Sequence, residues 1–147
     1  MVNSLIVNHT IWLILGIVLG VVFLLYARSG SKHREIQVLS AGLVVATVIY
    51  VGFAIIWGGY KWILIELAGV SIYGLFAWLA LRFNYNWLVF GWATHPAWDL
   101  MLHFFGDGRM IAPEWYVIAC ISFDFLIAAY IIITYKKIDF TEHIYQI

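Results

Sequence analysis

The sequence contains few charged residues. Only 11% of its 147 residues are charged, whereas a soluble domain carries about 25%. Hydrophobic residues make up 65% of the chain, and the mean hydropathy is +0.95. A packed core of this size cannot hide so much apolar surface from water. The composition therefore excludes an ordinary soluble domain and predicts a membrane protein whose main partner is the lipid bilayer.

The chain also lacks an excess of positive charge and a second cysteine. Eight Lys and Arg balance eight Asp and Glu, so no basic surface is available for phosphates, and nucleic acid is disfavoured as a partner. Cys120 is the single cysteine and has no partner for an intrachain disulfide. No charged region or small-residue cleavage site precedes the first apolar run, which predicts that this run is retained as a membrane span.

Five apolar segments divide the sequence. They cover residues 5–27, 36–57, 62–81, 87–105 and 115–135. Each has close to the ~20 residues that cross a bilayer as a helix, and no linker or low-complexity tract separates them. We therefore predict an all-α integral membrane protein in which residues 1–147 form one domain, a five-transmembrane-helix bundle.

The loops between these segments differ in positive charge. If the segments cross the membrane in turn, six Lys and Arg lie on one side and two on the other. The six are Arg28, Lys32, Arg34, Arg82, Lys136 and Lys137, and the two are Lys61 and Arg109. Because positive loops stay in the cytoplasm, the N-terminus is predicted outside and the C-terminus inside. The expected location is a cell membrane, the inner membrane if the source is bacterial.

The fourth segment carries three ionisable residues in a column. In "THPAWDLMLH", His95, Asp99 and His103 are spaced four residues apart, which places them on one face of an α-helix. Pro96 disrupts the helical hydrogen-bond pattern beside the first of them. The sequence therefore predicts either a kink at Pro96 or a broken helix, in which Thr94 or His95 caps a half-helix that begins at the proline.

Carboxylates in the third and fifth segments fall at a similar depth. At 1.5 Å per residue, Glu66 lies about 7 Å and Asp124 about 13 Å from the outer boundary, while the column extends from His103 near that boundary to His95 at about 15 Å. Charged side chains within a membrane face the bundle interior and pair there. We therefore predict that these side chains and Asp99 converge on one site in the outer half of the bilayer.

Imidazole and carboxylate groups suit zinc, iron or manganese. His95, Asp99 and His103 are the predicted metal ligands, and Glu66 and Asp124 the predicted catalytic residues, either as general base or to complete the shell. Residues i and i+8 lie about 12 Å apart on a straight helix, so one ion does not bind both histidines directly. The pairs His95 with Asp99, or Asp99 with His103, are the favoured ligand pairs.

The same residues also fit a purely structural interpretation. In this alternative, Asp99 lies between the two imidazoles and Asp124 pairs with His95, and the network holds the helices together. A third alternative is a relay of protonatable groups without metal. In the first segment, Gly16 and Gly20 form a Gly-x3-Gly step that predicts close packing against another helix.

The C-terminal half resembles an uncharacterised family of small bacterial integral membrane proteins. The resemblance rests on "HPAWDLMLH" followed by "PEWYVIACISFD". The positions that match the family's segments are His95, Trp98, Asp99, Pro113, Trp115, Tyr116, Cys120 and Asp124. His103 falls one residue later than the family spacing. The resemblance implies a shared site and no particular reaction.

Three functions follow from these patterns. The first is a metal-dependent membrane enzyme that acts on a lipid or isoprenoid substrate. The second is an accessory subunit of a larger membrane assembly, bioenergetic or homo-oligomeric, in which the polar cluster only stabilises the fold. The third is a small proton-coupled transporter whose broken fourth helix lines the pathway.

Overall fold

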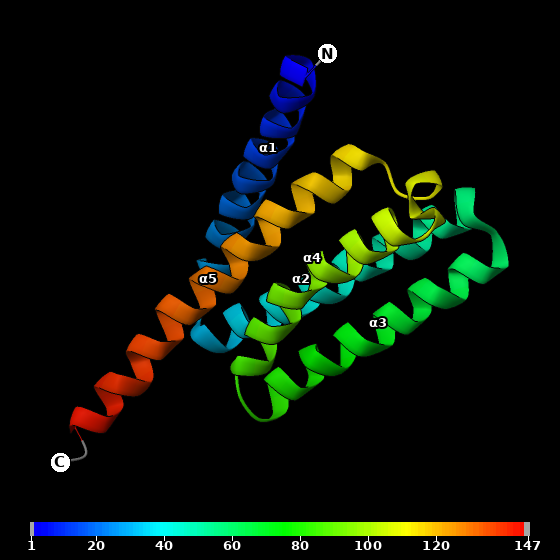
Figure 1. Cartoon of the computed structure of the whole chain (residues 1–147). Helices are drawn as coiled ribbons and strands as arrows, with labels where there is room; N and C mark the ends of the chain where they lie inside the picture. The colour runs from blue at the N-terminus through cyan, green and yellow to red at the C-terminus, as the bar shows by residue number, and fades with distance from the viewer. Residues whose placement is uncertain (1, 146–147) are drawn as a thin grey trace.

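The computed structural model describes the backbone of residues 2–145 and the side chains of residues 7–104 and 106–135. This part of the chain forms five long α-helices and no strand. They are α1 (Val2–Arg28), α2 (Lys32–Phe53), α3 (Gly59–Arg82), α4 (Asn86–Phe105) and α5 (Glu114–Tyr145) (Figure 1). Four of the predicted apolar segments fall within one of these helices, and the segment 36–57 covers most of α2 and most of the π-helical turn that follows it (Ala54–Gly58). The predicted all-α fold is confirmed.

Three continuous helical stretches are long and apolar enough to cross a membrane. They are Val7–Arg28, Lys32–Arg82 and Glu114–Tyr135. The second is 51 residues long, because a π-helical turn (Ala54–Gly58) joins α2 directly to α3. The two helices still lie side by side (Figure 1), since the chain reverses at Gly59, whose φ of 71° is in the left-handed region that favours glycine. These stretches indicate a membrane protein.

α4 is not among these stretches, because polar side chains interrupt its apolar run. Among them are Asn86, His95, Asp99 and His103. α4 nevertheless lies within the bundle, where it packs against α3 and α5 and also contacts α2. Its Trp92 is completely buried in the main hydrophobic core. His95, Asp99 and His103 are buried too, so these three polar residues of α4 are enclosed by apolar helices.

α4 is one uninterrupted helix, so the predicted broken helix is wrong. Pro96 lies inside it and is buried. The Thr94 side chain does not cap a half-helix, because its hydroxyl donates to the carbonyl of Phe90 at 2.7 Å, a bond that threonine makes inside helices. The Tyr73 hydroxyl on α3 donates to the Thr94 carbonyl at 3.1 Å. A neighbouring helix thus supports the backbone beside the proline, and a kink there stays a prediction.

α1 packs along α5 with its two glycines at the contact. A Cβ atom on either Gly16 or Gly20 would collide with α5, and at Gly16 it would overlap the Ala119 carbonyl oxygen and Ser122 Oγ. The Ser122 hydroxyl also donates to the Leu13 carbonyl at 2.8 Å, which ties the helices together. The close packing predicted from the Gly-x3-Gly step is confirmed.

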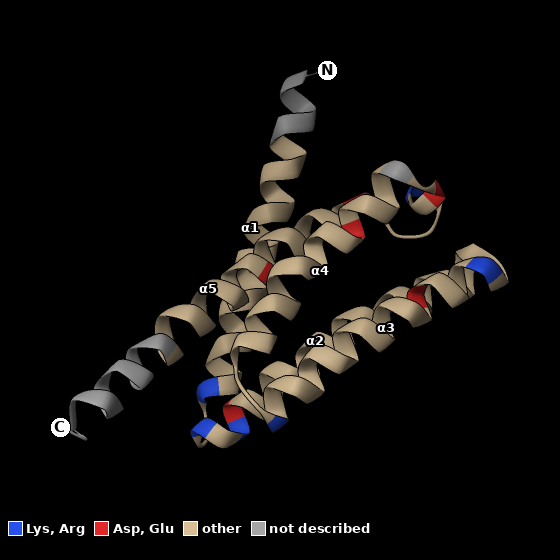
Figure 2. Ribbon diagram, turned by 60° about the horizontal axis from the view of Figure 1, so that its bottom comes forward, with Lys and Arg blue, Asp and Glu red and all other residues tan. Residues whose placement is uncertain are grey.

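Positive charge gathers at the end of the bundle where α1 meets α2 and α3 meets α4 (Figure 2). The described residues there are Arg28, Lys32, Arg34 and Arg82, whereas Lys61 and Arg109 lie at the opposite end. Lys136 and Lys137, which complete the predicted group of six, lie outside the described side chains. Among the described residues, positive charge is therefore unequal between the two ends of the bundle, as the predicted orientation requires.

Candidate functional site

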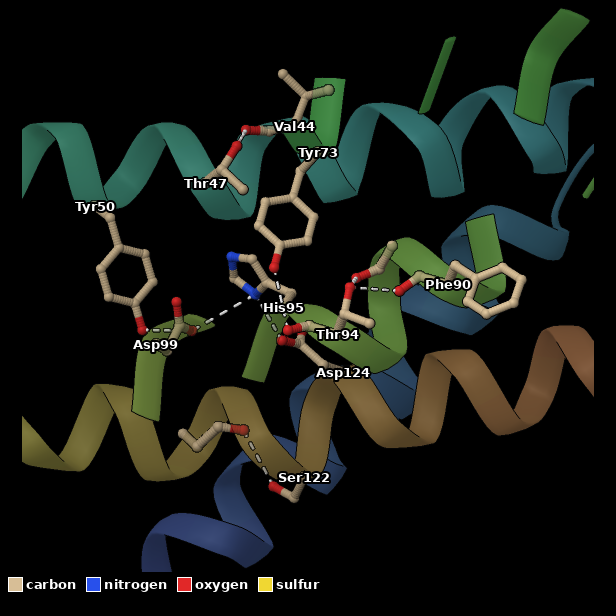
Figure 3. Close-up of polar contacts among 12 residues, drawn as sticks. Val44, Thr47, Tyr50, Tyr73, Phe90, Thr94, His95, Asp99, Ser122 and Asp124 are labelled. Carbon is tan, nitrogen blue, oxygen red and sulfur yellow. Dashed lines mark hydrogen bonds and ion pairs between the residues drawn. The ribbon is translucent and has the colours of Figure 1, made fainter. Parts of the chain in front are cut away.

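The site is built on the face of α4 that α5 covers. His95 and Asp99 are one helical turn apart, and their exposed fractions are only 1% and 2%. Asp124 on α5 is equally buried, at 1%. Asp124 comes 29 residues after His95 in the sequence, and the three side chains point toward one another (Figure 3).

Two carboxylates face the same nitrogen of the His95 ring. His95 Nδ1 lies 2.7 Å from Asp124 Oδ2 and 3.6 Å from Asp99 Oδ2. Among the described residues, these three form the one group of three that could hold a metal ion, with ligand atoms all within 4.8 Å of one another. The structure therefore brings together two of the three predicted metal ligands and one of the two predicted catalytic residues.

Two tyrosines that the sequence argument did not include hold this group in place. The Tyr50 hydroxyl on α2 donates to Asp99 Oδ2 at 2.7 Å. The Tyr73 ring on α3 meets the His95 ring edge to face, with 5.0 Å between ring centroids. Both tyrosines are buried in apolar helices, and a buried tyrosine hydroxyl normally has a hydrogen-bond partner. A tyrosine in the middle of an apolar segment was therefore the feature of the sequence that could have identified Tyr50 and Tyr73 as partners of the site.

Several buried polar atoms of the site have no hydrogen-bond partner among the described residues. They are His95 Nε2, Asp99 Oδ1, Asp124 Oδ1 and His103 Nδ1. Most buried side-chain polar atoms are paired, and one that is not calls for an explanation such as a water, an ion or a catalytic role. Because three of these atoms belong to His95, Asp99 and Asp124, whose ligand atoms lie within 4.8 Å of one another, the site has spare capacity for a polar ligand.

Glu66 and His103 lie beside this group and not in it. Both are buried, with exposed fractions of 5% and 4%. Together with Tyr50 and Asp99 they line a small cavity of about 10 Å³, which is close to the minimum for one water molecule. His103 and Asp99 line the same small cavity, but His103 does not belong to the group of ligand atoms formed by His95, Asp99 and Asp124. The roles of Glu66 and His103 stay predictions.

The donor set fits a divalent transition metal. One imidazole nitrogen and two carboxylates are typical ligands of zinc, iron and manganese, and three protein ligands leave a coordination position open to a substrate. Tyr50 supplies the outer hydrogen bond that orients a ligating carboxylate in many metal sites. The same contacts also form a buried hydrogen-bond network between α2, α4 and α5, so the geometry is compatible with the structural alternative as well.

Comparisons with known proteins give a family and no activity. The model of a family of unknown function (DUF6010) matches residues 11–137, which include every residue of the site. No curated protein and no solved structure matches the chain. The chemistry of the site therefore has to be inferred from its own residues.

Proposed function

The chain belongs to DUF6010, a family of unknown function, and we propose that it is a metal-dependent membrane enzyme. In this proposal His95, Asp99 and Asp124 hold a divalent zinc, iron or manganese ion. The observation that carries it is the convergence of three buried ligand atoms within 4.8 Å of one another. Charged side chains inside a membrane are costly, and those that persist usually mark functional sites.

The residues around the metal group then have distinct tasks. A divalent metal would supply a Lewis acid that polarises an oxygen of the substrate. Tyr50 keeps Asp99 in its ligating orientation through the 2.7 Å hydrogen bond. Glu66 is the carboxylate outside the metal group that lines the small cavity beside Asp99, so we assign it to accept a proton from a water bound there. Asp124 is assigned to the metal, and Glu66 is left as the general base.

The proposed substrate is a lipid or isoprenoid that reaches the site from the bilayer. The site is enclosed by apolar helices, and the side chains of the metal group are at most 2% exposed. A water-soluble substrate would have to leave its hydration shell to reach them, whereas a molecule dissolved in the hydrocarbon region would not.

The proposal also includes five membrane crossings with the N-terminus outside. α4 has 20 residues, which gives a helix about 30 Å long, the thickness of the hydrocarbon region. The end that carries Arg28, Lys32, Arg34 and Arg82 would face the cytoplasm. The site would then lie in the outer half of a cell membrane.

Metal content is the direct test of this function. Protein purified in detergent after growth with zinc, iron and manganese is expected to contain a stoichiometric amount of one of them by elemental analysis. His95→Ala and Asp99→Asn are expected to lose nearly all of it, because each removes one of only three ligands. His33→Ala, at an exposed position of α2, is the matched control and should retain the metal. A wild-type protein without stoichiometric metal would contradict the proposal.

Removing the Tyr50 hydroxyl is expected to weaken metal binding without abolishing it. Tyr50→Phe leaves Asp99 without its hydrogen bond, and the loss of such an outer partner typically lowers metal affinity about 10- to 100-fold. Competition with a chelator of known affinity measures the change. Tyr60→Phe is the control, since the Tyr60 side chain is 77% exposed. Equal affinities for the two variants would show that Tyr50 does not support the site.

The accessory-subunit function is the second candidate, and the 2.7 Å contact between His95 and Asp124 favours it. Such a pair stabilises the bundle even without a metal. The large apolar side chains exposed on α1, among them Ile14, Val18 and Leu25, would then face a partner subunit or a second copy of the chain as well as lipid. The transporter alternative has lost its main support, because α4 is not broken.

A further inference from the structure

A second cavity, much larger than the one for a single water, lies between α1, α2 and α5. Its volume is about 360 Å³, whereas an apolar cavity of about 150 Å³ is already large enough to bind benzene. Apart from Trp92 on α4, its lining residues fall within positions 16–23 of α1, 42–49 of α2 and 115–124 of α5, which is about 10–13 Å along each helix. The cavity is therefore elongated along the helices, in the direction that a lipid chain takes in a bilayer.

The wall of this cavity offers almost no polar group to an occupant. Asp124 and Trp92 contribute to the wall, but their atoms Oδ1 and Nε1, which lack a hydrogen-bond partner among the described residues, are buried. The other lining side chains are mostly aliphatic or aromatic, among them Phe23, Ala46 and Phe123. Because a polar group buried without hydrogen bonds is unfavourable, the part of a ligand that enters this cavity is a hydrocarbon.

The cavity opens sideways through the seam between α1 and α2. Leu19 on α1 and Val45 on α2 line it, although their side chains are 49% and 57% exposed. α1 packs mainly on α5 and α2 mainly on α3, so little closes the seam between α1 and α2. Both helices belong to stretches that are long and apolar enough to cross a membrane, and the mouth of the cavity therefore faces the hydrocarbon of the bilayer.

The mouth lies near the middle of both helices. Leu19 is nine residues before Arg28, the last residue of α1, and Val45 is thirteen residues after Lys32, the first residue of α2. These positions are about 14 Å and about 20 Å along the helices from their charged ends. The hydrocarbon region is about 30 Å thick, so its centre is about 15 Å from either boundary. The mouth is therefore close to the depth at which lipid chains end and far from the lipid headgroups.

We propose that this cavity binds the methyl-terminal part of one acyl chain of a bilayer phospholipid. The apolar wall accepts a hydrocarbon chain, and the central position of the mouth admits the end of a chain whose headgroup stays at the membrane boundary. The bound chain takes the place of the close side-chain packing that α1 and α2 lack between them. This binding is separate from the proposed function, because it requires neither a metal nor a reaction.

Photolabelling of the purified full-length protein in lipid nanodiscs tests which part of the lipid enters. The two probes are phosphatidylcholines with a diazirine near the methyl end or near the carboxyl end of one chain. Ala119 and Cys120 on α5 line the cavity and are only 6% and 9% exposed, so a label on them requires a chain inside. The methyl-end probe is expected to label these residues about 10-fold more strongly than the carboxyl-end probe. Equal labelling by the two probes, or no label on either residue, would overturn the proposal.

A change of headgroup and a free isoprenoid test the identity of the occupant. The methyl-end probe is prepared as phosphatidylcholine and as phosphatidylglycerol, which share their chains and differ in charge. Both are expected to label Cys120 equally, because the cavity holds only the chain. A preference of more than about 10-fold for one headgroup would overturn the assignment. Displacement of the probe by a trace of farnesol would overturn it as well, since a free isoprenoid would then be the preferred occupant.

Two valines on α2 provide a matched pair of variants that locates the mouth. Val45 lines the cavity and Val48 does not, yet their side chains are similarly exposed, at 57% and 49%. Val45→Trp is expected to reduce the labelling of Cys120 about 10-fold, whereas Val48→Trp should leave it unchanged. Phe125 is 51% exposed and does not line the cavity, so its labelling by surrounding lipid should be the same in both variants. Equal labelling of Cys120 in the two variants would contradict a mouth between α1 and α2 and overturn the proposal.

Discussion

Replacing Gly16 with leucine is expected to separate α1 from α5 and destabilise the fold strongly. A Cβ atom at this position would overlap the Ala119 carbonyl oxygen and Ser122 Oγ. Overpacking usually costs about 1–3 kcal/mol and sometimes more, and here one of the obstructing atoms belongs to the backbone of α5. The displaced helix would also lose the hydrogen bond from Ser122 to the Leu13 carbonyl. We therefore expect a loss of more than about 3 kcal/mol in the free energy of unfolding.

Gly74 provides the control for this substitution. It lies within α3, and a Cβ atom added there would have no neighbour within 4 Å. Gly74→Leu should therefore be neutral or stabilising, since glycine is a poor helix former by about 1 kcal/mol. Unfolding in detergent, followed by circular dichroism, measures both variants. If Gly16→Leu is as stable as Gly74→Leu, α1 and α5 do not pack as described.

Replacing His95 alone is expected to destabilise the protein, whereas replacing His95 and Asp124 together is not. His95→Leu leaves Asp124 buried without the His95 Nδ1 atom that lies 2.7 Å from it, and removing one partner of a buried pair costs about 3–5 kcal/mol. In the double variant His95→Leu/Asp124→Val, Asp99 still accepts a hydrogen bond from Tyr50. Apolar replacement of a whole buried pair is often neutral, so we expect the double variant within about 1 kcal/mol of the wild type.

This comparison distinguishes a functional site from a structural network. The unfolding free energies of the wild type, both single variants and the double variant form a double-mutant cycle that measures the coupling between the two residues. A stable double variant that binds no metal would show that the fold does not require the pair, which supports the metal-dependent function. A double variant as unstable as His95→Leu would favour the accessory-subunit function, in which the pair holds the helices together.

The sequence predicted the helices better than it predicted the site. Apolar runs of about 20 residues specify membrane helices almost alone, because every backbone polar group must be satisfied within the segment. For that reason all five segments fall on observed helices. The four-residue spacing of His95 and Asp99 placed them correctly on one face of α4. The broken helix at Pro96 was predicted wrongly, since α4 continues through the proline, as membrane helices packed among neighbouring helices can do.

Depth along the helices predicted that His95 and Asp124 would be close, since both were placed about 13–15 Å from one boundary. The same reasoning placed Glu66 about 7 Å from that boundary and His103 near it, and in the structure these two residues line a neighbouring cavity. Which of the residues at intermediate depth touch one another also depends on how each helix is rotated about its axis.

The sequence by itself determined that the protein is helical and that its helices are apolar enough for a membrane. These properties follow from local composition and from the rise of the helix. Only the tertiary structure decided that His95, Asp99 and Asp124 form one group, that Tyr50 supports it and that a large apolar cavity adjoins Asp124. Those features depend on the rotation and separation of helices distant in sequence, which side-chain packing sets and hydropathy does not record.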